Sequence, residues 1–136
     1  MKHIEIALGE YGVSEIPGAL TNPRITQYFK DLGLAYNEET SWCSCFANWV
    51  CMKAGLPRSG ALNARSWLAV GTKVDVPQLG DIVVFWRESP ASWMGHVSFY
   101  ISEDKDYIYC LGGNQSDSVC VGKYAKRQVL GFRRLT

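Results

Sequence analysis

The sequence predicts an α+β domain in which N-terminal helices pack on an antiparallel sheet of about five strands. Apolar residues recur at helical spacing in the first half of the chain, and short runs of β-branched and aromatic residues follow in the second half. Helices followed by a meandering sheet are typical of the α+β class. The 136 residues, 47% of them hydrophobic, suit one domain with one core.

Two short helices are predicted near the N-terminus. The first covers residues 3–10 and carries apolar residues on one face. The second is capped by Asn22, begins at Pro23 and ends before Gly33.

The third predicted helix, residues 42–55, is the centre of the sequence. Thr40 and Ser41 can cap its start, and Gly55 ends it. Cys43 therefore lies in the first turn, where the unpaired N–H groups and the helix dipole stabilise a thiolate. A cysteine nucleophile is usefully placed there, whereas a buried structural cysteine is the alternative interpretation.

The second half of the chain is predicted to form the sheet. Asn63 caps a short helical piece at 64–70, after which the β-branched and aromatic runs begin. The five predicted strands cover residues 81–86, 96–101, 107–111, 119–121 and 129–133.

Two polar residues stand where these strands begin or end. His96 opens the second strand, and Asn114 follows the third after Gly112 and Gly113. If the helix of Cys43 packs on this sheet, the imidazole can withdraw the thiol proton, and Asn114 can orient the imidazole. The structural alternatives are a strand-end histidine bonded to backbone and an asparagine that serves only the turn.

Composition excludes several other classes of protein. The net charge of +1 gives no general case for nucleic acid binding, and no apolar stretch approaches the length of a membrane helix. The first ten residues do not resemble a signal peptide. Five cysteines without a Cys-x-x-Cys pair, and only two histidines, do not match zinc spacings; Cys110 and Cys120 can pair or remain free thiols.

Several blocks carry a resemblance to a known family. Residues 42–46, 77–85 and 95–97 look like the blocks of the NlpC-like and CHAP cysteine peptidases, which are papain-like peptidoglycan hydrolases. Residues 64–67 and 111–115 resemble a compact branch common in bacteriophage genomes. The resemblance implies a papain-like fold in which residues 1–136 form a single catalytic domain.

On this resemblance, Cys43 matches the nucleophile, His96 the base and Asn114 the residue that orients the base. Many CHAP enzymes carry a glutamate at the position of Gly112, so this chain departs from them there. Residues 37–39 lack the alternating aspartates of calcium-binding CHAP loops. No metal or other cofactor is therefore expected.

A larger set of residues is expected to bind the substrate. Ser41 can join the backbone N–H of Cys43 in an oxyanion hole, and Arg65 can bind a stem-peptide carboxylate. The tryptophans can line a groove or belong to the core. The expected substrate-binding residues are Trp42, Ser41, Arg65, Trp67, Trp93 and Gln115.

The resemblance implies a phage endolysin that hydrolyses a peptidoglycan amide through a thioester. It acts either as a stem-peptide endopeptidase or as an N-acetylmuramoyl-L-alanine amidase. The expected partner is bacterial peptidoglycan, with no nucleic acid and no membrane insertion. The protein is expected to be a monomer, made in the host cytoplasm without a signal peptide and acting on the wall in the periplasm.

Other functions remain open for this fold. They are an injected wall-degrading effector of a secretion system, an acyltransferase or deconjugating peptidase, and a non-catalytic wall-binding module. Turnover of purified sacculi and the reactivity of Cys43 distinguish these alternatives.

Overall fold

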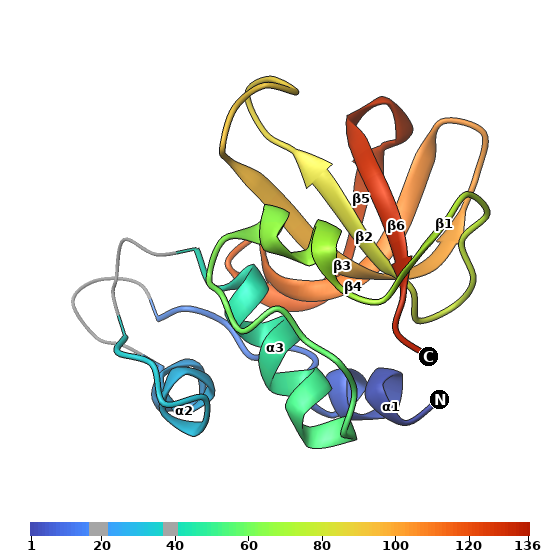
Figure 1. Ribbon diagram of the computed structural model, residues 1–136. Coiled ribbons are helices and arrows are strands. Elements are labelled where there is room, and N and C mark those ends of the chain that lie inside the picture. The colour runs from blue at the N-terminus through green and yellow to red at the C-terminus, as the bar shows by residue number, and fades with distance from the viewer. Residues whose placement is uncertain (17–21, 37–40) are drawn as a thin grey trace.

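The computed structural model, which describes residues 1–16, 22–36 and 41–136, places its α-helices on one side of a six-stranded antiparallel sheet (Figure 1). The helices are α1 (Lys2–Gly9), α2 (Pro23–Asp31) and α3 (Cys43–Ala54), with the 3-10 helices η1 (Ala64–Ala69) and η2 (Lys126–Gln128). The strands are β1 (Thr72–Val74), β2 (Ile82–Trp86), β3 (Gly95–Glu103), β4 (Tyr107–Gln115), β5 (Ser118–Ala125) and β6 (Val129–Arg134). The predicted α+β class is confirmed.

The strands lie in the order β1-β6-β2-β3-β4-β5, and every recorded pair is antiparallel. All five predicted strands are present, and β1 is a sixth that the sequence did not indicate. It has only three residues, it lies at the sheet edge beside β6, and two of its side chains are exposed. Such a strand lacks the alternating apolar pattern by which strands are predicted.

Two helix ends follow the predicted capping rules. The side chain of Asn22 accepts a hydrogen bond of 2.8 Å from the backbone N–H of Arg24, and Pro23 is the first residue of α2. Gly55 ends α3 in the left-handed conformation with φ of 70°. Glycine adopts this conformation without the steric cost that a Cβ atom would bring.

The start of α3 differs from the prediction. Trp42 holds the N-cap position, and among the described residues no side chain makes a capping hydrogen bond there. Ser41 instead directs its hydroxyl at the Sγ atom of Cys43, 3.5 Å away. Thr40, the other predicted cap, lies outside the described residues.

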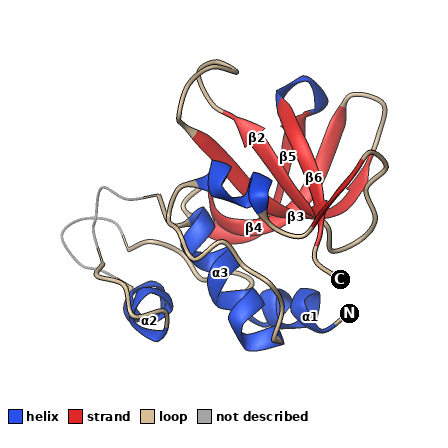
Figure 2. Ribbon diagram, in the orientation of Figure 1, coloured by secondary structure: helices blue, strands red, loops and turns tan. Residues whose placement is uncertain are grey.

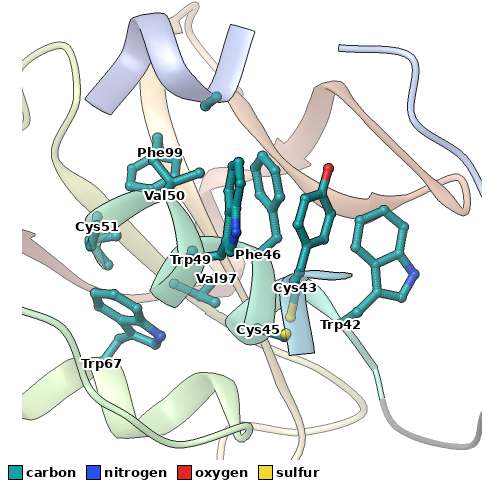
Figure 3. Close-up of a cluster of buried hydrophobic side chains, with 14 of the residues drawn as sticks. Trp42, Cys43, Cys45, Phe46, Trp49, Val50, Cys51, Trp67, Val97 and Phe99 are labelled. Carbon is teal, nitrogen blue, oxygen red and sulfur yellow. The ribbon is translucent and has the colours of Figure 1, made fainter. Parts of the chain in front are cut away.

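The core is built around α3, of which residues 43–51 are all buried. Figure 3 shows Phe46 and Trp49 of this helix among side chains of the sheet and of η1, including Phe99 and Trp67. A second, smaller cluster lies on the strands around Phe85. Both clusters include residues from strands of the same sheet. The helices lie together on one side of this sheet (Figure 2).

A glycine allows α3 to approach the end of β4 closely. A Cβ atom on Gly113 would lie 2.7 Å from the ring of Trp42 and 2.8 Å from the Cβ atom of Phe46. Real structures do not show such contacts, so any larger residue would push the helix away from the strand. The close approach brings the first turn of α3 against the sheet.

Asp81 fixes the turn before β2. Its carboxylate accepts hydrogen bonds from the backbone N–H of Gln78 at 2.8 Å and from the guanidinium of Arg134 at 2.8 and 3.1 Å. This ion pair, in which Asp81 is buried and Arg134 is partly exposed, joins the turn to the end of the neighbouring strand β6.

No helix within the described residues is both long and apolar enough to cross a membrane.

Candidate active site

Cys43 and His96 meet where α3 packs against β3. Cys43 is the first residue of α3, and His96 is the second residue of β3. Both side chains are largely buried, at 2% and 6% exposure. The contact predicted from their places on a helix and on a strand is therefore present.

The environment of Cys43 favours its thiolate. Burial alone would raise the pKa of the thiol, but the charge of His96 and a hydrogen bond with it act in the opposite direction. Hydrogen bonds from Ser41 and from the Val97 backbone add to the effect, and together they lower the pKa from 9.0 to about 7. A substantial fraction of this thiol is ionised at neutral pH.

The pKa of three other cysteine thiols is raised, whereas that of Cys43 is lowered. Burial raises the pKa of Cys45, Cys51 and Cys110 to about 12 each. Cys45 lies only two residues beyond Cys43 on the same helix, so helix position alone does not explain the difference. The contact with His96 is what separates the two cysteines.

Gln115 holds the imidazole of His96. The Oε1 atom of Gln115 lies 2.9 Å from Nε2 of His96 and accepts a second hydrogen bond, 2.8 Å long, from the hydroxyl of Ser98. The Nε2 atom of Gln115 donates to the backbone carbonyls of Cys110 at 3.2 Å and Cys120 at 2.6 Å. The side chain is 3% exposed and uses both ends of its amide.

This network fixes the tautomer of His96. Carbonyl oxygens only accept hydrogen bonds, so the NH₂ group of Gln115 must face Cys110 and Cys120, and its oxygen must face His96. The imidazole therefore carries a proton on Nε2 and donates it to Gln115. Nδ1 is left to exchange a proton with the thiol of Cys43.

The predicted contact between Asn114 and His96 is absent, and Gln115 replaces it. Phe99 of β3 pairs with Leu111 of β4, so an unbroken ladder would set Asn114 opposite His96 three residues further on. The β4–β5 register instead shifts between Gly112 and Gln115, and Asn114 adopts a left-handed φ of 56°. Because one extra residue reverses the face on which later side chains lie, Gln115 faces the imidazole.

Asn114 contacts the other side of the site. Its Nδ2 atom donates a hydrogen bond of 2.9 Å to the hydroxyl oxygen of Ser41. Ser41 in turn donates to the sulfur of Cys43. Asn114 thus reaches the nucleophile side through Ser41 and does not contact the base.

Glycines leave room for the Gln115 network. A Cβ atom on Gly112 would collide with Oγ of Ser98 and lie 2.9 Å from Oε1 of Gln115. A Cβ atom on Gly122 would lie 2.9 Å from Nε2 of Gln115. The position where many CHAP enzymes have a glutamate therefore has no space for a side chain in this chain.

Aromatic rings complete the setting of His96. Tyr124 of β5 stacks on the imidazole with a centroid distance of 4.8 Å and an interplanar angle of 27°. Phe85 of β2 stacks on the Tyr124 ring with a centroid distance of 4.8 Å, and its centroid lies 6.3 Å from that of the imidazole. These contacts restrict rotation of the imidazole, and no sequence pattern pointed to Tyr124 as part of the site.

Two hollows open beside the Cys43–His96 pair. The first, of about 410 Å³, is lined by Ser41, Cys43, Leu62, Asn63, Ala64, Arg87, Trp93, Met94 and Gly95, and we call it the Cys43 hollow. The second, of about 450 Å³, is lined by Phe85, Trp86, Arg87, His96, Asn114, Gln115, Ser116, Asp117, Tyr124 and Gln128, and we call it the His96 hollow. The pair thus has open space on both sides for an extended substrate.

Two of the tryptophans expected to bind the substrate belong to the core. Trp67 is fully buried, and its indole N–H donates to the hydroxyl of Ser44 at 2.9 Å. Trp42 is 2% exposed and donates to Glu15 at 3.0 Å. Their large apolar surfaces complete the packing of α3, so neither ring is open to a ligand.

Arg65 is also structural. Its guanidinium donates to the backbone carbonyls of Met94 and Pro90 at 2.9 Å each and of Ser89 at 3.2 Å. These bonds tie η1 to the loop between β2 and β3. Because all three guanidinium nitrogens of Arg65 already donate to this loop, the structure gives Arg65 a structural role, and its expected contact with a substrate carboxylate stays a prediction.

Ser41 and Trp93 lie where substrate-binding residues were expected. Both line the Cys43 hollow, and Trp93 is 78% exposed. The contact of Ser41 and Trp93 with a substrate stays a prediction. Gln115 differs from them, because its side-chain amide is hydrogen-bonded to His96, Ser98 and two backbone carbonyls.

All five cysteines are free thiols in the structure. Cys110 pairs with Gly122 and Cys120 with Gly112, so the two cysteines are offset along the ladder. Within the described ranges, no group of three or more His, Cys, Asp or Glu side chains could hold a metal ion. Residues 37–39, considered above for calcium, lie outside those ranges.

Comparisons with known proteins place the chain in a family. A family model described as the CHAP domain matches residues 35–114, which is more than half of the chain. No curated protein matches the sequence significantly.

Among solved structures, the fold resembles that of a Staphylococcus aureus protein described as similar to a lipoprotein of the NLP/P60 family. The TM-score is 0.56 and the sequence identity is 17%, over 98% of this chain and 40% of that one. The chain therefore spans less than half the length of this neighbour, with which it shares the papain-like fold. By the match to this family model over more than half of its length, the chain belongs to the CHAP family.

Proposed function

We propose that this protein cleaves an amide bond of peptidoglycan by a thiol mechanism, with Cys43 as nucleophile and His96 as base. One observation carries the proposal. The thiol of Cys43, alone among the cysteines whose pKa is shifted, has its pKa lowered, to about 7, and the cause is its contact with His96. A thiolate beside an imidazolium, between two open hollows, is the arrangement that nucleophilic attack on an amide needs.

The acylation step follows from this geometry. The thiolate of Cys43 attacks the carbonyl carbon, a carbon–sulfur bond forms, and the carbonyl electrons move to its oxygen. The backbone N–H of Cys43, at the start of α3, stabilises the resulting oxyanion. His96 then gives the proton on Nδ1 to the amide nitrogen, the carbon–nitrogen bond breaks, and the amine leaves from a thioester.

In the hydrolysis of the thioester, His96 accepts a proton, whereas in the preceding step it donated one. His96 takes a proton from a water molecule, whose oxygen attacks the thioester carbon. The carbon–sulfur bond breaks, a carboxylic acid is released, and the thiolate returns beside the imidazolium. Throughout, Nε2 stays bonded to Gln115, which holds the ring in place and stabilises its charge.

The biological setting forms part of the same proposal. Family membership supports peptidoglycan as the substrate, and the resemblance of several sequence blocks to a phage-associated branch supports an endolysin. In this setting residues 1–136 act as a single catalytic domain and as a monomer that reaches the wall from the host cytoplasm. Binding to nucleic acid and insertion into a membrane play no part.

The test is hydrolysis of purified sacculi by the wild type and by Cys43→Ala. We expect release of soluble fragments by the wild type and none by a folded Cys43→Ala variant, since the nucleophile is missing. Cys45→Ser is the matched control, because this thiol lies on the same helix with its pKa raised to about 12. Mass spectrometry of the fragments identifies the amide that is cut.

Three results would overturn the assignment. Lysis by folded Cys43→Ala would exclude the thiol mechanism. Binding of sacculi by the wild type without any turnover would favour a wall-binding module instead. Transfer of the acyl group to an added amine in preference to water would favour an acyltransferase.

A further inference from the structure

Among the described residues, the guanidinium of Arg87 at the site has no hydrogen-bond or ion-pair partner. Arg87 follows the last residue of β2, and its side chain is exposed. Within residues 1–16, 22–36 and 41–136, no hydrogen bond, ion pair or ring contact engages its guanidinium, whereas the other site arginine, Arg65, donates one hydrogen bond from each of its three guanidinium nitrogens to a backbone carbonyl. An arginine left free beside a reactive centre is available to a ligand.

Arg87 lies between the two hollows beside the Cys43–His96 pair. Among the described residues, it alone lines both the Cys43 hollow and the His96 hollow. Its backbone is held in place, since its N–H donates to the carbonyl of Met94, which also accepts from Arg65. The side chain of Arg87 therefore extends from a fixed point of the backbone beside both hollows.

The charges of the two hollows differ. Apart from the Cys43–His96 pair, whose opposite charges offset each other between the hollows, the described residues that line the Cys43 hollow include one charged side chain, Arg87, whereas those of the His96 hollow include Arg87 and Asp117. A carboxylate is attracted into the first hollow and meets a negative charge in the second. Arginine binds carboxylates with two parallel hydrogen bonds, which makes the match specific as well as favourable.

The mechanism assigns the two hollows to the two halves of the substrate. His96 must protonate the leaving amine, so the amine side of the bond lies toward the His96 hollow. The acyl side then extends into the Cys43 hollow, where Trp93 and Met94 offer apolar contact.

We infer that Arg87 binds a free carboxylate on the acyl-donor residue of the substrate. This inference rests on the proposed function and refines it. A bond inside an acidic stem peptide can offer such a carboxylate. The muramoyl–alanine amide cannot, because the only carboxyl group of its lactyl acyl donor is the one in the bond. The structure thus favours an endopeptidase over an amidase.

The experiment compares two synthetic stem-peptide mimics that differ only in a carboxylate or a carboxamide on the acyl-donor residue. Binding is measured by calorimetry in a Cys43→Ala background, so that it does not depend on turnover. We expect the carboxylate mimic to bind about 10- to 100-fold more tightly, the range for hydrogen bonds to a charged group. Adding Arg87→Gln should remove this preference, and Arg87→Lys should retain part of it.

Arg58→Gln is the matched control, because it removes the same charge from an exposed residue outside both hollows. It should leave the preference unchanged. Equal binding of the two mimics, or a preference that survives Arg87→Gln, would overturn the inference.

Digestion of sacculi by the wild type separates this result from the broader proposal. Absence of cleavage would refute the proposed function, whatever the binding data show. Cleavage only at the muramoyl–alanine amide would leave the hydrolase standing and refute the role of Arg87.

Discussion

The two reactive side chains of the site are held in different ways. Cys43 is placed by apolar packing: its helix is buried along 43–51, and its sulfur has one hydroxyl contact, at 3.5 Å. His96 is placed by polar bonds and ring stacking, through Gln115 at 2.9 Å and Tyr124 at 4.8 Å. The nucleophile depends on where a helix lies, and the base depends on a connected set of hydrogen bonds.

This difference predicts different responses to substitution. Loss of a single apolar contact lowers the free energy of unfolding only gradually, because many contacts contribute to it. A buried hydrogen-bond network behaves differently, because removing one member leaves its partners without bonds. Substitutions around His96 should therefore change the rate more than substitutions of the polar neighbours of Cys43.

The largest expected effect is that of His96→Ala. It removes the base and also the main cause of the lowered pKa of Cys43. Hydrolysis should fall by about 10³-fold or more, as on loss of other catalytic bases. The rate of alkylation by iodoacetamide, followed against pH, reports the thiolate directly.

In the wild type, this alkylation should rise with pH through an inflection near 7, because the thiol is protonated below its pKa and unreactive there. In His96→Ala the inflection should move to higher pH, since burial then acts with less opposition. An unchanged inflection would mean that His96 does not set the state of the thiol.

Gln115→Ala should have the next largest effect. It frees the imidazole from its fixed tautomer and should lower the rate by about 10- to 1000-fold, or about 1–4 kcal/mol of activation free energy. It also leaves the Ser98 hydroxyl and two carbonyls without their partner, at a cost of about 1–3 kcal/mol of stability. Urea unfolding and initial rates on sacculi measure the two effects separately.

Ser98→Ala is the matched control for this network. It removes the other donor to the same oxygen of Gln115 and leaves the bond to His96 in place. A purely structural role for Gln115 would make both variants lose stability with no change in the pH of the alkylation inflection. A positioning role requires that Gln115→Ala shift this inflection and that Ser98→Ala leave it near 7.

The sequence predicted the parts of this molecule that depend on local periodicity and capping. As expected, Asn22 caps the start of α2, Gly55 ends α3, and Cys43 lies in the first turn of α3. These features depend on a few neighbouring residues whose conformational preferences are strong. The meeting of Cys43 with His96 was predictable only because the resemblance supplied the way in which helix and sheet pack.

The parts that failed depend on register and on competition for partners. A single extra residue between Gly112 and Gln115 exchanged the roles of Asn114 and Gln115, and nothing in the alternation of the sequence marks that shift. Arg65 and Arg87 have the same side chain. The guanidinium of Arg65 is hydrogen-bonded and that of Arg87 is not, because the carbonyls of the loop between β2 and β3 lie beside Arg65. Ser98 alone had a usable signal, because it lies two residues from His96 and so on the same face of β3.

The smallest expected effects concern the polar chain from Asn114 through Ser41 to Cys43. The Nδ2 atom of Asn114 donates to the hydroxyl oxygen of Ser41, which leaves the hydroxyl proton to point at the sulfur. Ser41→Ala removes that proton and should lower the rate about 2- to 10-fold, the range for a neutral hydrogen bond.

Asn114→Gly removes the amide without straining the left-handed backbone at this position, which Asn114→Ala would do. Its effect should be of the same size, and the double variant should be no slower than Ser41→Ala, because Asn114 acts only through Ser41. Asn114→Asp should be slower than Asn114→Gly, since a carboxylate accepts the Ser41 proton and draws it away from the sulfur. Additive losses in the double variant would show instead that Asn114 contacts the substrate or the base directly. In the latter case, Asn114 would share with Gln115 the contact with His96 that the structure assigns, of the two residues, to Gln115 alone.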